Sequence, residues 1–146
     1  MFKFDMETLL NYRVQVEEQC QRSFSNAVKC LQAARIVLAD LQKERNELIR
    51  KFTKIQDKAL RSDVIQRHFA FIEYLKGKEE KQMAVIQKME EDANEKKQLL
   101  LDAMKKRKIM DTLREKKLDA YLQDMAAKER KETDDFTIMK FGNGIR

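Results

Sequence analysis

The chain has 146 residues, of which 38% are charged and 8% aromatic, and its formal net charge is +6. It contains no proline or tryptophan and only three glycines. Because proline breaks helices, this composition is typical of long helices and coiled coils rather than of a globular domain with a thick core. A coiled coil offers no deep pocket, so the composition argues against an enzyme.

The first arm is predicted from an apolar series between residues 24 and 59, which follows alternating steps of three and four. Only Arg45 interrupts this series, and the pattern predicts a heptad seam on one face of a long helix. Before it, a short series keeps the helical period with a shifted phase, as at a stutter. The earlier series consists of Leu9, Tyr12, Val16 and Cys20, and the later one of Phe24, Ala27, Leu31, Ala34, Leu38, Leu41, Leu48, Phe52, Ile55 and Ala59.

A second heptad series predicts the second arm, and Leu118, Leu122 and Met125 extend its stripe. Glu79 and Arg107 interrupt the series. Ser62 or Asp63 can cap the start of this helix, because short polar side chains accept hydrogen bonds from the first free N–H groups. The series consists of Ile65, His68, Ile72, Leu75, Ile86, Met89, Ala93, Leu100, Ala103 and Met110.

The two series together predict an all-α fold, a long antiparallel two-helix coiled coil (helical hairpin). We expect residues 1–146 to form a single hairpin. Its parts are arm one at about 1–60, a turn at about 60–64, arm two at about 65–138 and a frayed tail at 139–146.

Facing residues of an antiparallel pair have numbers with a constant sum, and one register matches the apolar residues of both series. It places Leu31 opposite Ala93 and Leu38 opposite Ile86. We expect the interruptions to select this register, because a slipped pairing would bury charge against apolar groups. The same register matches each interruption with an opposite charge: Arg45 with Glu79, Glu17 with Arg107, and Arg13 with Asp111.

Sequence motifs for chemistry are missing. The chain has no glycine-rich phosphate loop, no Cys-x-x-Cys and no His-x-x-x-His. The one histidine, His68, falls on a seam position, where packing explains it. We therefore expect no catalytic residue, no cofactor and no metal. Cys20 and Cys30 would lie about 15 Å apart along one helix, too far for a disulfide.

An aromatic patch near the bend is the most informative exposed feature. Phe71 and Tyr74 do not fit the inward row of the second arm, Leu75 lies at its margin, and Lys78 follows one turn later. Exposed aromatic residues on a charged helix suggest a protein-binding surface with Lys78 as a polar rim. The alternative is that the seam is wider here, or that a nearby turn covers Phe71.

Residues 96–117 form a basic stretch, with nine basic and three acidic residues. Such a stretch can meet nucleic acid, anionic lipid or an acidic protein face, or it can be a solvated helix face. It lacks aromatic residues for base stacking, so no nucleic acid is expected as a partner. The chain has no run of about 20 apolar residues and no apolar signal segment at its start, so we expect a cytosolic protein.

Five short segments, in this order and spacing, resemble the FliJ family of bacterial flagellar type III export proteins over nearly the whole chain. The segments are Phe2-Lys3-Phe4, LLNYR at 9–13, RHFAFIEYL at 67–75, LREKK at 113–117 and ETDDF at 132–136.

The resemblance implies a soluble component of the flagellar export machine, with a coiled coil similar to the central stalk of rotary ATPases. Such a protein would bind the flagellar export ATPase, the export-gate membrane protein and the export chaperones. It would be cytoplasmic and peripheral at the cytoplasmic face of the cell membrane through these partners. Its role would be in flagellum biogenesis, and through motility in chemotaxis.

The resemblance also implies where the partners bind. The middle motif makes Phe71 and Leu75, with Tyr74 and Lys78 of the same patch, the candidates for the export gate. The two chain ends would address the ATPase ring, with candidates Phe2, Phe4, Arg114, Lys116, Asp134 and Asp135. A generic coiled-coil scaffold and a basic nucleic-acid-binding coiled coil remain the alternatives. A prefoldin-like arm is disfavoured, because no β-hairpin signal lies near the bend.

Overall fold

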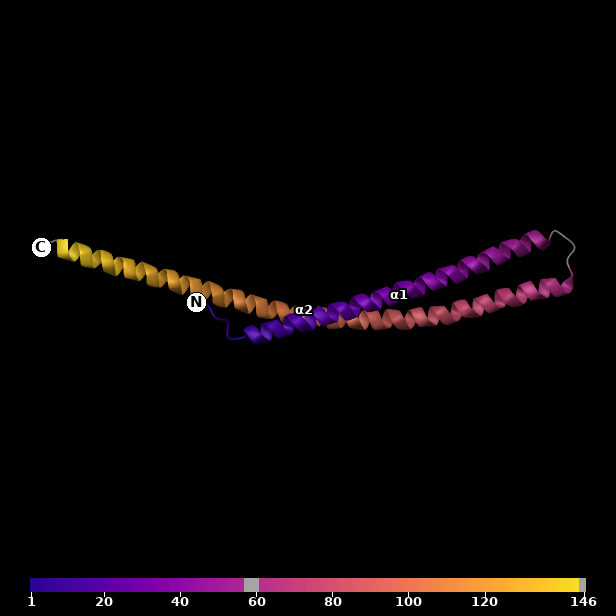
Figure 1. Cartoon of the computed structure of the whole chain (residues 1–146), viewed down its shortest axis with the longest axis horizontal. Helices are drawn as coiled ribbons and strands as arrows, with labels where there is room; N and C mark the ends of the chain where they lie inside the picture. The colour runs from indigo at the N-terminus through magenta and orange to yellow at the C-terminus, as the bar shows by residue number, and fades with distance from the viewer. Residues whose placement is uncertain (57–60, 145–146) are drawn as a thin grey trace. The chain divides into compact units, whose positions relative to one another are not determined.

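The structure is a computed structural model that describes residues 1–56 and 61–144. It contains two helices, α1 (Glu7–Gln56) and α2 (Ser62–Gly144), and no strand within these residues (Figure 1). The all-α antiparallel two-helix coiled coil predicted from the heptad pattern is confirmed. Neither helix has a stretch that is both long and apolar enough to cross a membrane.

At the start of each helix, carbonyl or carboxylate oxygens accept hydrogen bonds from the first backbone amides. The Glu7 amide donates to the Phe4 carbonyl at 3.1 Å where α1 begins. In α2 the carbonyl of Arg61 accepts the first helical hydrogen bonds, so the predicted caps fall inside the first turn. There the Asp63 carboxylate accepts from the Val64 amide at 3.0 Å, which suits the positive end of the helix dipole.

The expected boundaries differ from those of α2 at both ends. Part of the expected turn at about 60–64 falls on residues 57–60, outside the described residues, and α2 already begins at Ser62. At the other end α2 continues to Gly144, through residues for which a frayed tail was expected. The absence of proline removes the strongest helix breaker from this stretch.

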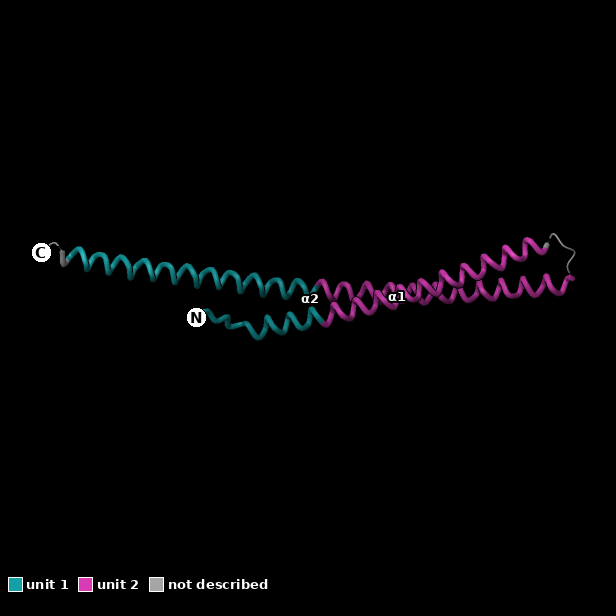
Figure 2. Tube along the Cα trace, turned by 45° about the horizontal axis from the view of Figure 1, so that its top comes forward, with its two compact units in different colours: residues 1–18, 102–146 teal, residues 19–101 magenta. Residues whose placement is uncertain are grey.

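The chain divides into two compact units, coloured in Figure 2. Unit 2, Gln19–Leu101, pairs the later part of α1 with the first part of α2 in antiparallel directions. Its core contains Leu31, Ala34 and Ile86, with Leu38 and Met89 packed against them. The described members of the predicted first seam, from Phe24 to Ile55, are all buried or half-buried. The heptad prediction for this region is therefore confirmed.

Unit 1 joins Met1–Glu18 with Asp102–Arg146. Phe4, Leu10 and Met110 form its buried core, and Phe2, Val14 and Leu113 pack against them. The predicted stutter is wrong here, because Leu9 and Tyr12 are exposed while Leu10 is buried. The heptad instead runs on without a shift through two charged residues, Arg13 and Glu17, both half-buried.

The first residues of the chain pack against α2 in unit 1 through an aromatic pair. The Phe2 and Tyr121 rings are 5.5 Å apart between centroids and tilted by 51°. Every α2 residue from 122 to 142 is exposed. This free stretch of α2 lacks the partner that its earlier part has in the same unit.

Candidate functional site

The ion pair predicted for the seam of unit 2 is present. Arg45 lies 3.1 Å from the Glu79 carboxylate. Glu79 is only 4% exposed, and its second oxygen has no hydrogen-bond partner among the described residues. Such a pair adds little stability over apolar residues of the same size, but it strongly disfavours registers that would separate the two charges.

A second predicted ion pair joins the two helices in unit 1. Glu17 accepts a hydrogen bond from Arg107, which also donates to Asp111 one turn further along α2. The hydrogen bond to Glu17, followed by that to Asp111, raises the pKa of Arg107 above its ordinary value. The predicted pairing of Asp111 with Arg13 is wrong: Asp111 pairs with Arg107, and Arg13 lies 5.8 Å from the centre of the Tyr12 ring.

The aromatic patch near the bend is exposed as predicted. Phe71 and Tyr74 are 43% and 55% exposed, and their ring centroids are 6.0 Å apart. The Lys78 ammonium lies 4.9 Å from the centre of the Tyr74 ring. A hydrogen bond with the Tyr74 side chain is the main cause of a raised pKa for Lys78. The patch therefore combines two aromatic faces with a fixed cation.

Leu75 occupies a different position from the other three candidates. It is 2% exposed, the most buried large side chain among the described residues. A side chain this deep in the seam cannot touch a partner directly, so its placement at the margin of the binding surface is corrected. It stabilises the helix that carries Phe71 and Tyr74.

A shallow groove extends the aromatic patch toward the bend. It is lined by Leu48, Val64, Arg67, His68 and Phe71. Arg67 lies one helical turn before Phe71, and the sequence reasoning missed it. Arg67, Phe71, Tyr74 and Lys78 follow one another at steps of four, three and four residues, so they lie on one face of the helix. This spacing is the sequence signal that identifies Arg67 as part of the patch. His68 packs against Phe52, with ring centroids 5.9 Å apart, as a seam histidine.

Of the six residues expected to contact the ATPase ring, only three lie close together in the structure. The Arg114 guanidinium lies 6.0 Å from the centre of the Phe2 ring, and its Nε donates to Glu7 at 3.2 Å. Phe4 is buried below them, with the Lys117 ammonium 5.6 Å from its ring centre. Phe2, Phe4 and Arg114 thus form one small cluster in unit 1.

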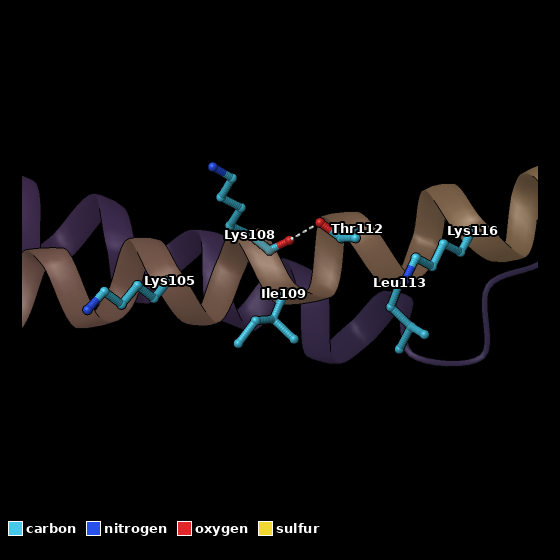
Figure 3. A pocket seen from close by; sticks show the side chains of 6 residues that line it. All are labelled: Lys105, Lys108, Ile109, Thr112, Leu113 and Lys116. Atoms are coloured by element: carbon cyan, nitrogen blue, oxygen red, sulfur yellow. Dashed lines mark hydrogen bonds between the residues drawn. The ribbon is translucent and has the colours of Figure 1, made fainter.

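The other three candidates lie elsewhere on α2. Lys116 borders a groove in which Ile109 and Leu113 project from the same side of the helix, one turn apart (Figure 3). Lys105, Lys108 and Thr112 complete the lining of this groove. Asp134 and Asp135 lie exposed on the free stretch, well beyond Tyr121.

Several cations of the basic stretch 96–117 are neutralised within the chain. Lys96 pairs with Asp92, Arg107 with Glu17 and Arg114 with Glu7. This pairing weakens the nucleic-acid alternative, because paired cations release fewer counterions from a phosphate backbone. Among residues 1–56 and 61–144, no cluster of His, Cys, Asp and Glu has the composition to hold a metal ion.

The family model described as "Flagellar FliJ protein" matches residues 2–146. The chain belongs to the FliJ family. Membership associates it with type III export in the flagellum. No curated protein matches its sequence.

The fold of this FliJ-family chain is similar to that of a solved structure from Chlamydia trachomatis, a proposed YscO homologue. The two share 17% sequence identity at a TM-score of 0.53, and the match covers 95% of this chain and 94% of the other. At this identity the likeness supports the fold and carries no statement about partners.

Proposed function

We propose that this chain is a stalk-like adaptor of the flagellar type III export apparatus. It binds the export ATPase ring, the export-gate membrane protein and export chaperones, and it contributes no catalytic group. In this proposal it works at the cytoplasmic face of the cell membrane and is held there by its partners. The observation that carries the proposal is the exposed aromatic pair Phe71 and Tyr74, with the Lys78 ammonium beside the Tyr74 ring, on a FliJ-family coiled coil.

The aromatic patch has the physical properties of an interface hot spot. Aromatic rings bury a large area with few rotatable bonds, and cations at the rim complement acidic groups on a partner. Phe71 and Tyr74 supply the rings, and Arg67 and Lys78 the flanking cations. We assign this surface to the export gate. Leu75 acts indirectly, by fixing the helix under the patch.

The cluster of Phe2, Phe4 and Arg114 is our proposed contact for the ATPase ring. It holds both arms of the coiled coil together in unit 1 and presents a half-buried ring beside a guanidinium. Asp134 and Asp135 lie further along the same helix and would contact the ring separately, as would Lys116. The two partners therefore use different residues, and each interaction can be removed alone.

The gate assignment is tested by Phe71→Ala, with Phe141→Ala as the matched control. Both rings are exposed, so neither substitution should change thermal unfolding appreciably. Binding to the purified cytoplasmic domain of the export gate should weaken about tenfold or more for Phe71→Ala, as for a hot-spot aromatic residue. Phe141→Ala should bind the gate normally. Equal gate binding by both variants would reject the patch as the contact.

The ATPase assignment is tested by Arg114→Ala, with Arg35→Ala as its control in unit 2. Arg114→Ala should weaken capture of the purified export ATPase and leave gate binding intact, because it removes the guanidinium beside Phe2. Arg35 pairs with Glu90 on an exposed face and should be neutral for both partners. If Arg114→Ala bound the ATPase as tightly as the unchanged chain, the cluster would have no role in that contact.

A further inference from the structure

The free stretch of α2 carries an apolar stripe with heptad spacing. From the half-buried Leu118, steps of four and three lead to residues 122, 125, 129, 132, 136 and 139. Four of these are large apolar residues that are 41–68% exposed: Leu122, Met125, Phe136 and Met139. A helix with such a stripe normally buries it against another helix. Within unit 1, Met1–Lys3 reach only the start of the stripe, where they share a groove with Ala120, Tyr121 and Asp124, and every residue from 122 to 142 is exposed.

Two positions in the middle of the stripe are acidic, Glu129 and Glu132. Two of the three charged seam positions of α1 show how the chain compensates such an interruption, while the third, Arg13, lies beside the Tyr12 ring. Arg45 meets Glu79 in unit 2, and Glu17 meets Arg107 in unit 1. In both cases an opposite charge on the facing helix compensates the interruption. By the same rule, Glu129 and Glu132 require cations on whatever helix covers the stripe.

The free stretch of a second copy cannot supply those cations from its own stripe, which contains no Lys or Arg. In an antiparallel pair of free stretches, Leu122 faces Met139 and Met125 faces Phe136, and the same register sets Glu129 against Glu132. In a parallel pair, each glutamate faces its own counterpart. Both arrangements bring like charges together at the centre of the seam, which is destabilising. The stripe is therefore built to exclude its own copy.

We propose that residues 118–139 of α2 bind a helix of another protein, whose apolar heptad carries Lys or Arg opposite Glu129 and Glu132. The apolar residues supply affinity, and the two glutamates select the partner and reject self-association. This surface is separate from the aromatic patch of residues 67–78, and it does not depend on which export component occupies that patch.

The experiment uses the full chain and synthetic peptides that span residues 118–142. The test peptide carries Glu129→Lys and Glu132→Lys, so that antiparallel pairing sets each lysine against a glutamate of the full chain. The control peptide carries Asp124→Lys and Asp134→Lys, which give the same net charge but lie off the stripe. A third peptide keeps the natural sequence. Binding is measured by fluorescence anisotropy at low and at moderate salt.

We expect the test peptide to bind about tenfold tighter than the control peptide, from two favourable cross-helix pairs and the loss of two repulsions. The natural peptide should bind no better than the control. Equal binding of the test and control peptides would overturn the proposal. Tighter binding of the natural peptide would also overturn it, and would make a second copy the occupant.

A variant of the full chain gives an independent readout. In Glu132→Lys, antiparallel pairing of two copies sets Lys at 132 against Glu129 twice, so the variant should self-associate. Sedimentation equilibrium should show its dimer dissociation constant at least about tenfold below that of the unchanged chain. Asp124→Lys, which has the same charge change off the stripe, should self-associate no more than the unchanged chain. Equal self-association of both variants would overturn the charge rule on which the proposal depends.

Discussion

The paired and the free parts of α2 have similar compositions, but their stripe residues differ in burial. In unit 2, Leu75 is buried to 2% exposure in the seam, whereas Leu122 in the free stretch is 55% exposed. Charged stripe positions differ in the same way, because Glu79 has Arg45 opposite and Glu129 has no facing residue within unit 1. Burial along this helix is therefore set by the presence of a complementary facing helix. Hydrophobicity alone does not determine it.

The largest expected effect comes from making the same substitution in both parts. Leu75→Ala should lower the free energy of unfolding by about 2–5 kcal/mol, because it removes buried side-chain volume. Leu122→Ala should change it by less than about 0.5 kcal/mol, as for an exposed residue. Urea unfolding followed by circular dichroism measures both. Similar losses for the two variants would mean that the free stretch is covered in solution.

A cross-link can fix the paired part in its register. With Cys20 and Cys30 replaced by serine, Leu38→Cys with Ile86→Cys should form a disulfide within one chain, since both side chains belong to one core cluster. It should raise the free energy of unfolding by about 2–4 kcal/mol. Non-reducing electrophoresis and unfolding with and without reductant check this.

The control for the cross-link uses Ile36→Cys in place of Leu38→Cys. Ile36 points away from the seam and is exposed, so this variant should not close the bridge within the chain. Disulfides formed between chains in dilute solution by the Leu38 and Ile86 pair would contradict an intramolecular hairpin.

Substitution of Glu79, the buried charged residue of the seam, should have the next largest effect on the free energy of unfolding. Glu79→Lys should cost about 1–3 kcal/mol, because it sets two cations against each other at a nearly buried site. Adding Arg45→Glu should restore more than half of that loss by reversing the pair. Chemical unfolding of both single variants and the double variant gives the coupling energy. Additive losses would show that the two residues do not depend on each other.

The smallest effect is expected for an ion pair on the surface of the same unit. Arg35 and Glu90 lie 3.0 Å apart, but their side chains are 56% and 46% exposed. Arg35→Ala should cost only about 0.2–1 kcal/mol, and added salt should reduce the difference further. A loss as large as that of Glu79→Lys would contradict the view that burial decides the importance of these pairs.

Heptad spacing was sufficient to predict the architecture and most of the register. The pairs Arg45–Glu79 and Glu17–Arg107 follow from one pairing rule applied to both arms, and the structure contains both. Arg13–Asp111 failed because a flexible carboxylate can choose between facing and same-helix cations, and Asp111 lies one turn from Arg107. Residue spacing alone does not say which of two nearby cations a carboxylate will pair with.

The candidate site was predictable to a smaller extent. The sequence separated Phe71 and Tyr74 from the inward row correctly, but it placed Leu75 at a margin although the side chain is fully enclosed. It also took Leu9 and Tyr12 as seam residues, because an apolar series is easier to follow than one that continues through Arg13 and Glu17. In a two-helix seam, half-buried charged residues can occupy heptad positions at which an apolar residue is expected.

The contact between Phe2 and Tyr121 has a consequence for the order of folding. The chain between these two rings is about seven times as long as that between Phe52 and His68, which also touch. Closing the longer loop directly costs about 2 kcal/mol more in chain entropy. Pairing of the two helices should therefore start at Phe52 and His68 and extend residue by residue toward the ends of the chain. The contact of Phe2 with Tyr121 then forms last and opens first. Among the paired residues, hydrogen exchange should accordingly be fastest in the first turns of α1 and slowest in the amides around Leu31 and Ile86.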